Sequence, residues 1–316
     1  MPAPDTAYIG LDVGGTFLKG ARIDPSGKVL ARLHEPIRKA SSTEILGQLA
    51  GAVETLEKGV GPSLAVGVGL PGIVEMTRGR VRSAPNAPAL DGLKVGEELE
   101  ARTGRASFAE NDANAAALAE AWLGAGRGAS HVLYVTLGTG VGGGLVFDGR
   151  IWLGRNGYAG EIGHIQVQPD GHPCGCGSWG CLETIAGVPG WARRAEELIA
   201  AGRTSTLAGR SPLDPQVIVE AARGEDSVAL EVVDGAARAI GVGVAAVLDL
   251  LNVDRVVIGG GVAAAGFFLL ERIAEETRRR TFPHVFADVT FRLAELGADA
   301  GVVGAARVGM IGVGNG

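Results

Sequence analysis

The pattern of apolar and polar positions repeats once along the chain. The segments Tyr8–Asp24 and Val132–Asp148 match at a constant offset of 124 residues. In each segment a run of β-forming residues enters a glycine cluster, and a second apolar run leaves it. This pattern predicts an antiparallel β-hairpin, and its two copies predict two lobes that begin alike.

Apolar residues with helical spacing follow each hairpin. The first such segment has one stripe, formed by Ile45, Leu46, Leu49 and Val53. Helices are predicted in three segments: Ser41–Lys58, Val188–Ala201 and Ser227–Leu251. Short apolar runs bounded by Gly, Pro or Asn predict further strands: Leu64–Leu70, Ala106–Ala109, Arg255–Ile258 and Val289–Arg292. The predicted class is therefore α/β, in duplicate.

Length and charge narrow the class of protein. At about 100–200 residues per domain, 316 residues predict two domains. The net charge of −6 lacks the basic excess that binding a phosphate backbone requires, so we expect no nucleic-acid partner. Gly128–Phe147 has no charged side chain, but its six glycines and His131 argue against a membrane helix. The N-terminus has no signal-peptide pattern, so we expect a cytoplasmic protein with no membrane partner.

All the cysteines lie close together. Cys174, Cys176 and Cys181 follow His164 in the pattern H-x9-C-x-C-x4-C, and glycines between them allow the chain to bend. Three thiolates and one imidazole form a ligand set typical of structural zinc, with no position left open for a substrate. The alternative is three reduced, buried thiols, which would not explain the glycines. We expect a structural zinc site.

Three glycine clusters suit anion binding. The first is DxGGTxxK, where Asp12 could organise magnesium through water and small residues let backbone N–H groups approach a phosphate. The second is LGTGVGGG at Leu137–Gly144, and the third is Gly259–Gly261, after a predicted strand and before a predicted helix. An ordinary hairpin turn, or close packing of a strand on a helix, would explain any one of them. The first and second clusters occur at matching places in the two predicted lobes, and this repetition favours phosphate binding.

Carboxylates accompany these clusters. Asp112 and Asn111 begin the alanine-rich segment ENDANAAALAEAW, where either could simply cap a helix. If the glycine clusters bind a phosphoryl donor, Asp112 is the candidate base that accepts a hydroxyl proton. Glu161 and Glu183 flank the cysteine cluster, so a metal there would hold both in place for sugar hydroxyls, although they could also be ordinary solvated glutamates.

Taken together, the motifs DVGGTFLKG, ENDANAAALAE, LGTGVGGG, EIGH and CGCGSWGCLE resemble the ROK family of bacterial sugar kinases and repressors, in that order and over nearly the whole chain. The resemblance implies two ribonuclease H-like lobes of the actin and hexokinase type, with an interlobe cleft and a zinc knuckle at residues 164–183. We expect the first lobe to span residues 1–118, joined by 300–316, and the second to span 119–299.

The resemblance also implies roles for individual residues. Asp112 is similar to the family's catalytic base, and Mg-ATP is the implied phosphoryl donor. His164 is expected to hold sugar while its other nitrogen binds zinc. The expected sugar ligands are Gly72, Asn86, Asn111, Asp112, Glu161, His164 and Glu183. The expected nucleotide contacts are Asp12, Gly14, Gly15, Thr16, Lys19, Gly138, Thr139 and Gly140 toward phosphate and magnesium, and Gly260 and Gly261 toward adenosine.

Glucose is the expected substrate, since the ENDANAAALAE string is most similar to the glucokinase branch of the family. The sequence departs from the glucokinase pattern at two places. Residues Ala186–Val188 stand where many of these glucokinases read ASG, and the loop after Asn86 lacks a common Gly-Trp element. N-acetylmannosamine, N-acetylglucosamine and fructose therefore remain alternative substrates. A sugar-sensing regulator is the alternative, but such regulators resemble this chain preceded by a DNA-binding domain, and here only Met1–Ala7 precede the first predicted strand. By resemblance we expect a homodimer or homotetramer.

Overall fold

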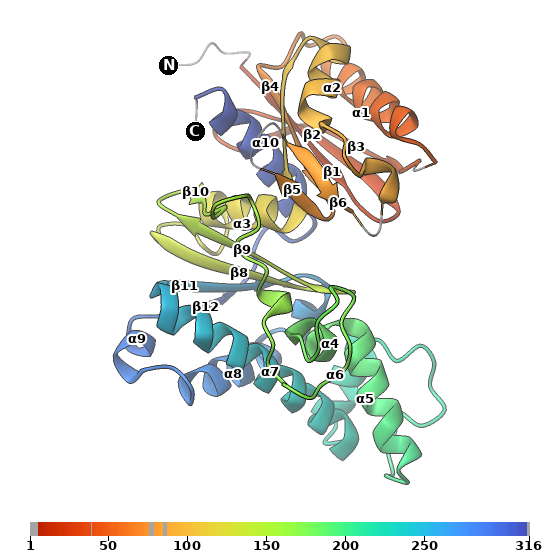
Figure 1. Ribbon diagram of the computed structural model, residues 1–316, viewed down its shortest axis with the longest axis vertical. Coiled ribbons are helices and arrows are strands. Elements are labelled where there is room, and N and C mark those ends of the chain that lie inside the picture. Colours follow the sequence, from red (N-terminus) through yellow and green to blue (C-terminus); the bar gives the residue numbers. More distant parts are fainter. Residues whose placement is uncertain (1–5, 39, 76–78, 85–86, 315–316) are drawn as a thin grey trace. The chain divides into compact units, whose positions relative to one another are not determined.

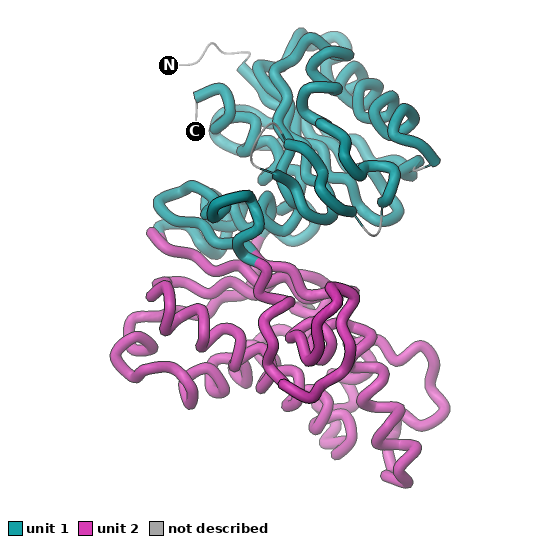
Figure 2. Tube along the Cα trace, in the orientation of Figure 1, with its two compact units in different colours: residues 1–128, 144–160, 296–316 teal, residues 129–143, 161–295 magenta. Residues whose placement is uncertain are grey.

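The protein divides into two compact units, each assembled from separate parts of the sequence (Figure 2). The computed structural model describes residues 6–38, 40–75, 79–84 and 87–314. Unit 1 comprises residues 1–128, 144–160 and 296–316, and unit 2 comprises residues 129–143 and 161–295. The lobe boundary expected at residues 118 and 119 stays a prediction.

Unit 1 is built on a five-stranded mixed sheet with the order β3-β2-β1-β4-β7 (Figure 1). Its strands are β1 (Tyr8–Val13), β2 (Phe17–Ile23), β3 (Val29–Pro36), β4 (Ala65–Leu70) and β7 (Ala106–Asn111). β2 is antiparallel to β1 and β3, whereas β4 is parallel to β1 and β7. A separate small sheet pairs β5 (Ile73–Glu75) with β6 (Arg80–Ser83).

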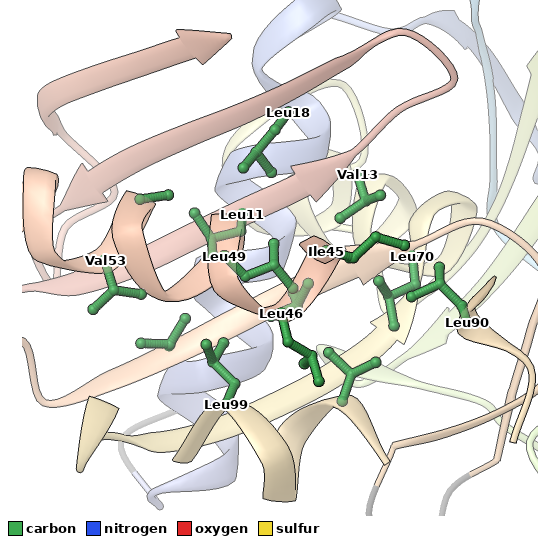
Figure 3. Close-up of a cluster of buried hydrophobic side chains, with 14 of the residues drawn as sticks. Leu11, Val13, Leu18, Ile45, Leu46, Leu49, Val53, Leu70, Leu90 and Leu99 are labelled. Carbon is green, nitrogen blue, oxygen red and sulfur yellow. The ribbon is translucent and has the colours of Figure 1, made fainter. Parts of the chain in front are cut away.

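A leucine-rich core joins this sheet to α1 (Ser42–Glu57) and α2 (Val95–Thr103). The N-cap Ser41 begins α1 by accepting a hydrogen bond from the Glu44 amide at 3.2 Å. The predicted stripe of α1 then packs on the sheet, so that Leu46 and Leu49 point toward Leu11 of β1 (Figure 3). Burial of this stripe stabilises α1 and sets its orientation on the sheet.

The other face of the sheet packs on α3 (Asp112–Leu123) and α10 (Ala300–Gly312). Here backbone meets backbone. A Cβ at Gly10 of β1 would lie 1.9 Å from the Val302 carbonyl oxygen, and one at Gly67 of β4 would lie 1.7 Å from that of Ala305. No side chain fits between α10 and these strands, so glycine is required at both positions.

The second five-stranded sheet has the order β10-β9-β8-β11-β12. Its strands are β8 (His131–Leu137), β9 (Val141–Phe147), β10 (Arg150–Ile151), β11 (Arg255–Gly259) and β12 (Thr290–Leu293). β11 is parallel to both β8 and β12. The division between the two units falls inside β9, after Gly143.

The long helix α7 (Ser227–Leu251) is the central helix of unit 2 and contacts α4, α5, α6 and α8. The other helices of the unit are α4 (Leu182–Ala186), α5 (Val188–Ala200), α6 (Pro215–Arg223), α8 (Phe267–Arg278) and α9 (Pro283–Ala287). Short 3-10 turns lie at Pro88–Leu90, Ile162–His164, Gly261–Ala265 and Gly297–Asp299. None of the helices in the described part of the chain has the length and hydropathy needed to cross a bilayer.

The structure confirms the α/β class and both hairpins. β1 and β2 pair antiparallel across Gly14–Thr16, and β8 and β9 are neighbours joined at Gly138–Gly140. The predicted helices and the four further predicted strands appear within two residues of their expected bounds. Periodicity missed β3, because an edge strand with mostly exposed residues has little apolar pattern. It also missed the helices α2, α6 and α10.

We predict that Gly67→Ala destabilises unit 1 by about 3 kcal/mol or more, because the added methyl group forces α10 away from β4. Gly47→Ala is the matched control: Gly47 is an exposed α1 residue, and a Cβ there meets nothing within 4 Å. This control should leave stability unchanged or raise it, since alanine favours helix. Thermal and urea unfolding of the two variants measure the difference; equal midpoints would contradict the packing described.

Candidate active site

The first glycine cluster is the exposed turn of the β1–β2 hairpin. Gly14 closes the turn by donating from its amide to the Phe17 carbonyl oxygen at 3.0 Å. Gly15 and Thr16 are exposed, and a Cβ at Gly15 would meet nothing within 4 Å. The turn therefore offers backbone and hydroxyl groups to an anion without steric obstruction.

Asp12 lies beneath this turn, opposite Lys19 in the β1–β2 register. Burial raises the pKa of the Asp12 carboxyl, and the Lys19 charge opposes the rise. The carboxylate lies close to the start of α10, since a Cβ at Gly301 would be 2.5 Å from Asp12 Oδ2. A cation bound nearby would favour the ionised form of Asp12, which is the form that can organise magnesium.

The junction of β7 and α3 holds the predicted base. Asn111 is the N-cap of α3: its Oδ1 accepts from the Asn114 amide at 3.0 Å, and its Nδ2 donates to the Gly72 carbonyl oxygen at 2.9 Å. Asp112 is the first residue of α3, and its Oδ1 accepts from the Ala113 amide at 2.8 Å. The helix start therefore fixes the backbone of both residues.

Several predicted residues of unit 1 gather around Gly69. A Cβ at Gly69 would lie 3.8 Å from both Asp12 Oδ1 and Asp112 Cα. Because β1 and β4 are parallel neighbours and β4 pairs with β7, these strands bring Asp12 beside the Asp112 backbone. Asn111 links the same region to Gly72. Asn86 lies outside the described residues.

In unit 2 the second glycine cluster rests on Glu183. The Val141 amide donates to Glu183 Oε2 at 3.0 Å, and a Cβ at Gly140 would lie 2.3 Å from the same oxygen. The amide of Val188 donates to the Gly138 carbonyl oxygen at 2.9 Å. The α4–α5 segment therefore supports the whole Gly138–Gly140 turn.

The third glycine cluster adjoins the second. Gly260 has a φ of +84°, and a Cβ there would lie 2.3 Å from the Leu137 carbonyl oxygen, so glycine is required by close packing. Gly261 is exposed and open. The helix expected at this cluster is a short 3-10 helix, Gly261–Ala265, and α8 follows at Phe267. Ligand binding at this cluster stays a prediction.

The cysteine and histidine side chains converge at one point. Their ligand atoms all lie within 4.8 Å of one another. The Sγ atoms of Cys176 and Cys181 are 3.7 Å apart, and Cys174 Sγ is 3.6 Å from His164 Nδ1. Tetrahedral zinc places two sulfur ligands about 3.8 Å apart, and sulfur and nitrogen about 3.6 Å apart. The four side chains fit a zinc ion.

Carboxylates border this cluster on two sides. Glu161 Oε2 lies 3.9 Å from His164 Nε2, the nitrogen that does not face Cys174. Glu183 Oε1 lies 4.0 Å from Cys174 Sγ, while its Oε2 holds the Val141 amide. Burial raises the pKa of the Glu161 carboxyl, His164 opposes the rise, and Glu183 adds to it. Glu183 thus connects the cysteine cluster to the second glycine turn.

Sequence reasoning missed Glu110 as a site residue. Glu110 is 8% exposed, and its Oε1 accepts from the Asn111 amide at 2.9 Å and from Asn114 Nδ2 at 3.0 Å. A glutamate near the end of a short strand, four residues before an asparagine, was the available signal. Glu110 holds the backbone of the residue that precedes Asp112.

Two mixed sheets, each opening with a hairpin and covered by helices, define an α/β fold of the actin and hexokinase type. A ROK hexokinase from Thermus thermophilus has this fold, with a TM-score of 0.86, 36% identity, and coverage of 98% of this chain and 100% of its own. The chain belongs to the ROK family, whose model matches residues 8–309.

Two further relatives cover nearly the full length. A glucokinase of Halalkalibacterium halodurans is 40% identical over 310 residues, which are 95% of this chain and 94% of the relative. A ROK family glucokinase from Streptomyces griseus, solved in complex with glucose and AMPPNP, has a TM-score of 0.80 and 34% identity, covering 96% of this chain and 99% of its own.

We predict that Gly140→Ala lowers the stability of unit 2 by about 1–3 kcal/mol. The methyl group would displace the Glu183 carboxylate and leave the half-buried Val141 turn without its acceptor. Gly235→Ala in α7 is the control, because a Cβ at Gly235 meets nothing within 4 Å. Thermal unfolding compares the two variants, and a Gly140→Ala midpoint as high as that of the control would show that Glu183 does not support the turn.

Proposed function

We propose that this protein transfers the γ-phosphoryl group of Mg-ATP to a hydroxyl of glucose, giving glucose 6-phosphate and ADP. The main support is the arrangement around Gly69, where the acidic residue of a phosphate-binding hairpin lies beside the backbone of Asp112, the first residue of α3. The family membership and the relatives named as glucokinases support the same reaction.

In the proposed reaction Asp112 accepts the proton of the attacking sugar hydroxyl. The hydroxyl oxygen forms a bond to the γ-phosphorus, and the bond from that phosphorus to the bridging oxygen breaks as ADP leaves. The turn at Gly14–Thr16 and Lys19 would stabilise the charge on the phosphoryl oxygens, together with Gly138–Gly140. Magnesium arrives with ATP and neutralises phosphate charge, and Asp12 is the residue that would organise its water ligands.

The sugar is held by polar side chains from both units in this proposal. Asn111 and the Gly72 turn would position it next to Asp112, while Glu161, His164 and Glu183 would accept and donate hydrogen bonds to its hydroxyls. A site of this kind rejects a wrong hexose when that hexose leaves one of its buried polar groups unpaired.

Zinc has a structural role in this account. His164, Cys174, Cys176 and Cys181 would hold the ion, and they leave no position open for substrate. A bound zinc would orient the His164 imidazole through Nδ1 and fix the segment that carries Glu183. The ion would therefore support sugar binding and the second glycine turn together.

Asp112→Asn is expected to lower kcat at least about 100-fold, since the amide cannot accept the hydroxyl proton. Asparagine keeps an oxygen for the Ala113 amide, so glucose affinity should change little. Coupled measurement of ADP release gives kcat, and calorimetric titration gives the glucose affinity. Glu54→Gln, an exposed substitution of the same kind on α1, should have wild-type kinetics. Substantial residual turnover in Asp112→Asn would remove Asp112 from the role of base.

Metal analysis of the purified protein should find close to one zinc ion per chain. Cys176→Ser should lower the zinc content and the melting temperature, and it should weaken sugar use through Glu183. Ser178→Ala changes the same loop but keeps all four ligands, so it should retain zinc. A fully active protein without metal would contradict the zinc assignment, and unchanged sugar kinetics in Cys176→Ser would contradict the coupling.

A further inference from the structure

Unit 1 contains a cavity of about 710 Å³, and none of the predicted sugar or nucleotide residues that the structure describes lines it. Its walls come from α2, β7, α3, α10 and the segment around β10. Most of the lining is apolar: Phe108, Leu118, Ile151, Leu153, Val308 and Ile311. Sites for small organic ligands have this size and this mostly apolar character, with a few polar groups that orient the ligand.

Glu110 is the polar residue of this cavity that could orient a ligand. It is 8% exposed, and it lines the cavity at the end of β7. The Asn111 amide and Asn114 Nδ2 both donate to Oε1. Among the residues that the structure describes, no donor lies within hydrogen-bond distance of Oε2. Oε2 therefore keeps access to the solvent in the cavity. A ligand that donates to Oε2 would gain a hydrogen bond to a carboxylate, which is stronger than one between neutral groups.

The charged residues around the cavity determine which charge a ligand's hydrogen-bond donor group should carry. Among the described residues that line it, Glu97, Glu100 and Glu110 are acidic and Arg150 is cationic. Lys94 pairs with Glu97 at 3.1 Å, so these described residues leave more carboxylates than cations. This balance favours a cation and disfavours a phosphate or carboxylate. The apolar walls in turn favour an apolar body over a sugar, whose hydroxyls they could not satisfy.

Glu110 connects the cavity to the junction that carries the proposed base. The same carboxylate that lines the cavity holds the Asn111 amide, and Asn111 caps α3 immediately before Asp112. Burial raises the pKa of Glu110, with Asn114 and Asn111 opposing the rise, so a ligand cation would change its charge balance. Occupation of the cavity would therefore act on the position of Asn111 and Asp112.

We propose that this cavity is a binding site for a small organic amine with an apolar body, whose ammonium group bonds to Glu110 Oε2, and that its occupation alters turnover through the β7–α3 junction. The binding site goes beyond the proposed kinase activity and does not depend on it. Only the effect on turnover rests on the proposed function.

Calorimetric titration of the full chain with 2-phenylethylammonium tests the site, with 3-phenylpropanoate as the probe that has a similar body and the opposite charge. The amine should bind saturably, and the carboxylate at least about tenfold more weakly. Glu110→Gln keeps an oxygen for Asn111 and Asn114 but replaces the Oε2 acceptor with a donor, so it should weaken amine binding about tenfold or more. Equal affinity for both probes, or no saturable binding, would overturn the site.

Glu110→Gln could weaken amine binding by disturbing the local structure, so a second variant tests the site independently. Val308→Trp fills the cavity from a half-buried position on α10 that contributes nothing to the proposed catalytic machinery. It should melt like the wild-type protein, retain basal kinase activity and lose amine binding. Amine binding that survives in Val308→Trp would place the ligand elsewhere and refute the assignment.

The effect on turnover is measured separately. The amine should change kcat for glucose in the wild-type protein and leave Val308→Trp unaffected. If the amine binds but kcat does not respond, the connection through Glu110 is wrong, although the site remains. If the protein has no kinase activity at all, the titration still decides the binding site, so failure of the two proposals can be told apart.

Discussion

The backbone of α10 lies directly against β1 and β4, with glycine at each point of contact. Gly10 and Gly67 on the strands face the Val302 and Ala305 carbonyl groups, and Gly304 on the helix approaches the Ala115 carbonyl group of α3. This contact brings the end of the chain onto the first sheet. It also places Gly301 against the Asp12 carboxylate, so the packing of a C-terminal helix determines the surroundings of an N-terminal acidic residue. The surroundings of Asp12 in unit 1 depend on it.

A comparable role in unit 2 belongs to Glu183. One of its carboxylate oxygens accepts from the Val141 amide, and the other approaches Cys174. Gly187 allows the same close approach, since a Cβ there would lie 2.9 Å from the Thr139 carbonyl oxygen. The departure from the family pattern at Ala186–Val188 therefore places a glycine, Gly187, where the second turn and the α4–α5 segment meet. In each unit a glycine lies against a carboxylate of the candidate site: Gly301 against Asp12, and Gly140 against Glu183.

Local patterns predicted the hairpins, the long helices and the cysteine cluster because each depends on neighbours in sequence. The stripe on α1 and the period of α7 are of this kind. The helix α10 could not be predicted in this way: its sequence AGVVGAARVGMIG is rich in glycine and largely buried, so it has no polar face to reveal a period. Its position depends on backbone contacts with residues nearly 300 positions earlier, as the contact with Gly10 illustrates.

Some residues of the candidate site could likewise be predicted from local sequence patterns, and others could not. The glycine clusters and the Cys/His cluster have fixed spacing and were found from motifs. The neighbours of Asp12 and Asp112 around Gly69 instead follow from the strand order β1-β4-β7. Glu110 was missed because its role is to hold a backbone amide and line a cavity, which needs the packed structure to be recognised. Selectivity among hexoses depends on the same fine placement of polar groups.

The most direct test of the proposed kinase is ADP release from Mg-ATP, measured with glucose, mannose, N-acetylmannosamine, N-acetylglucosamine and fructose in turn. The account predicts sugar-dependent ADP release with the highest kcat/KM for glucose. A higher kcat/KM for another sugar would contradict the substrate assignment, and ADP release no faster than without sugar for all five would contradict the kinase itself.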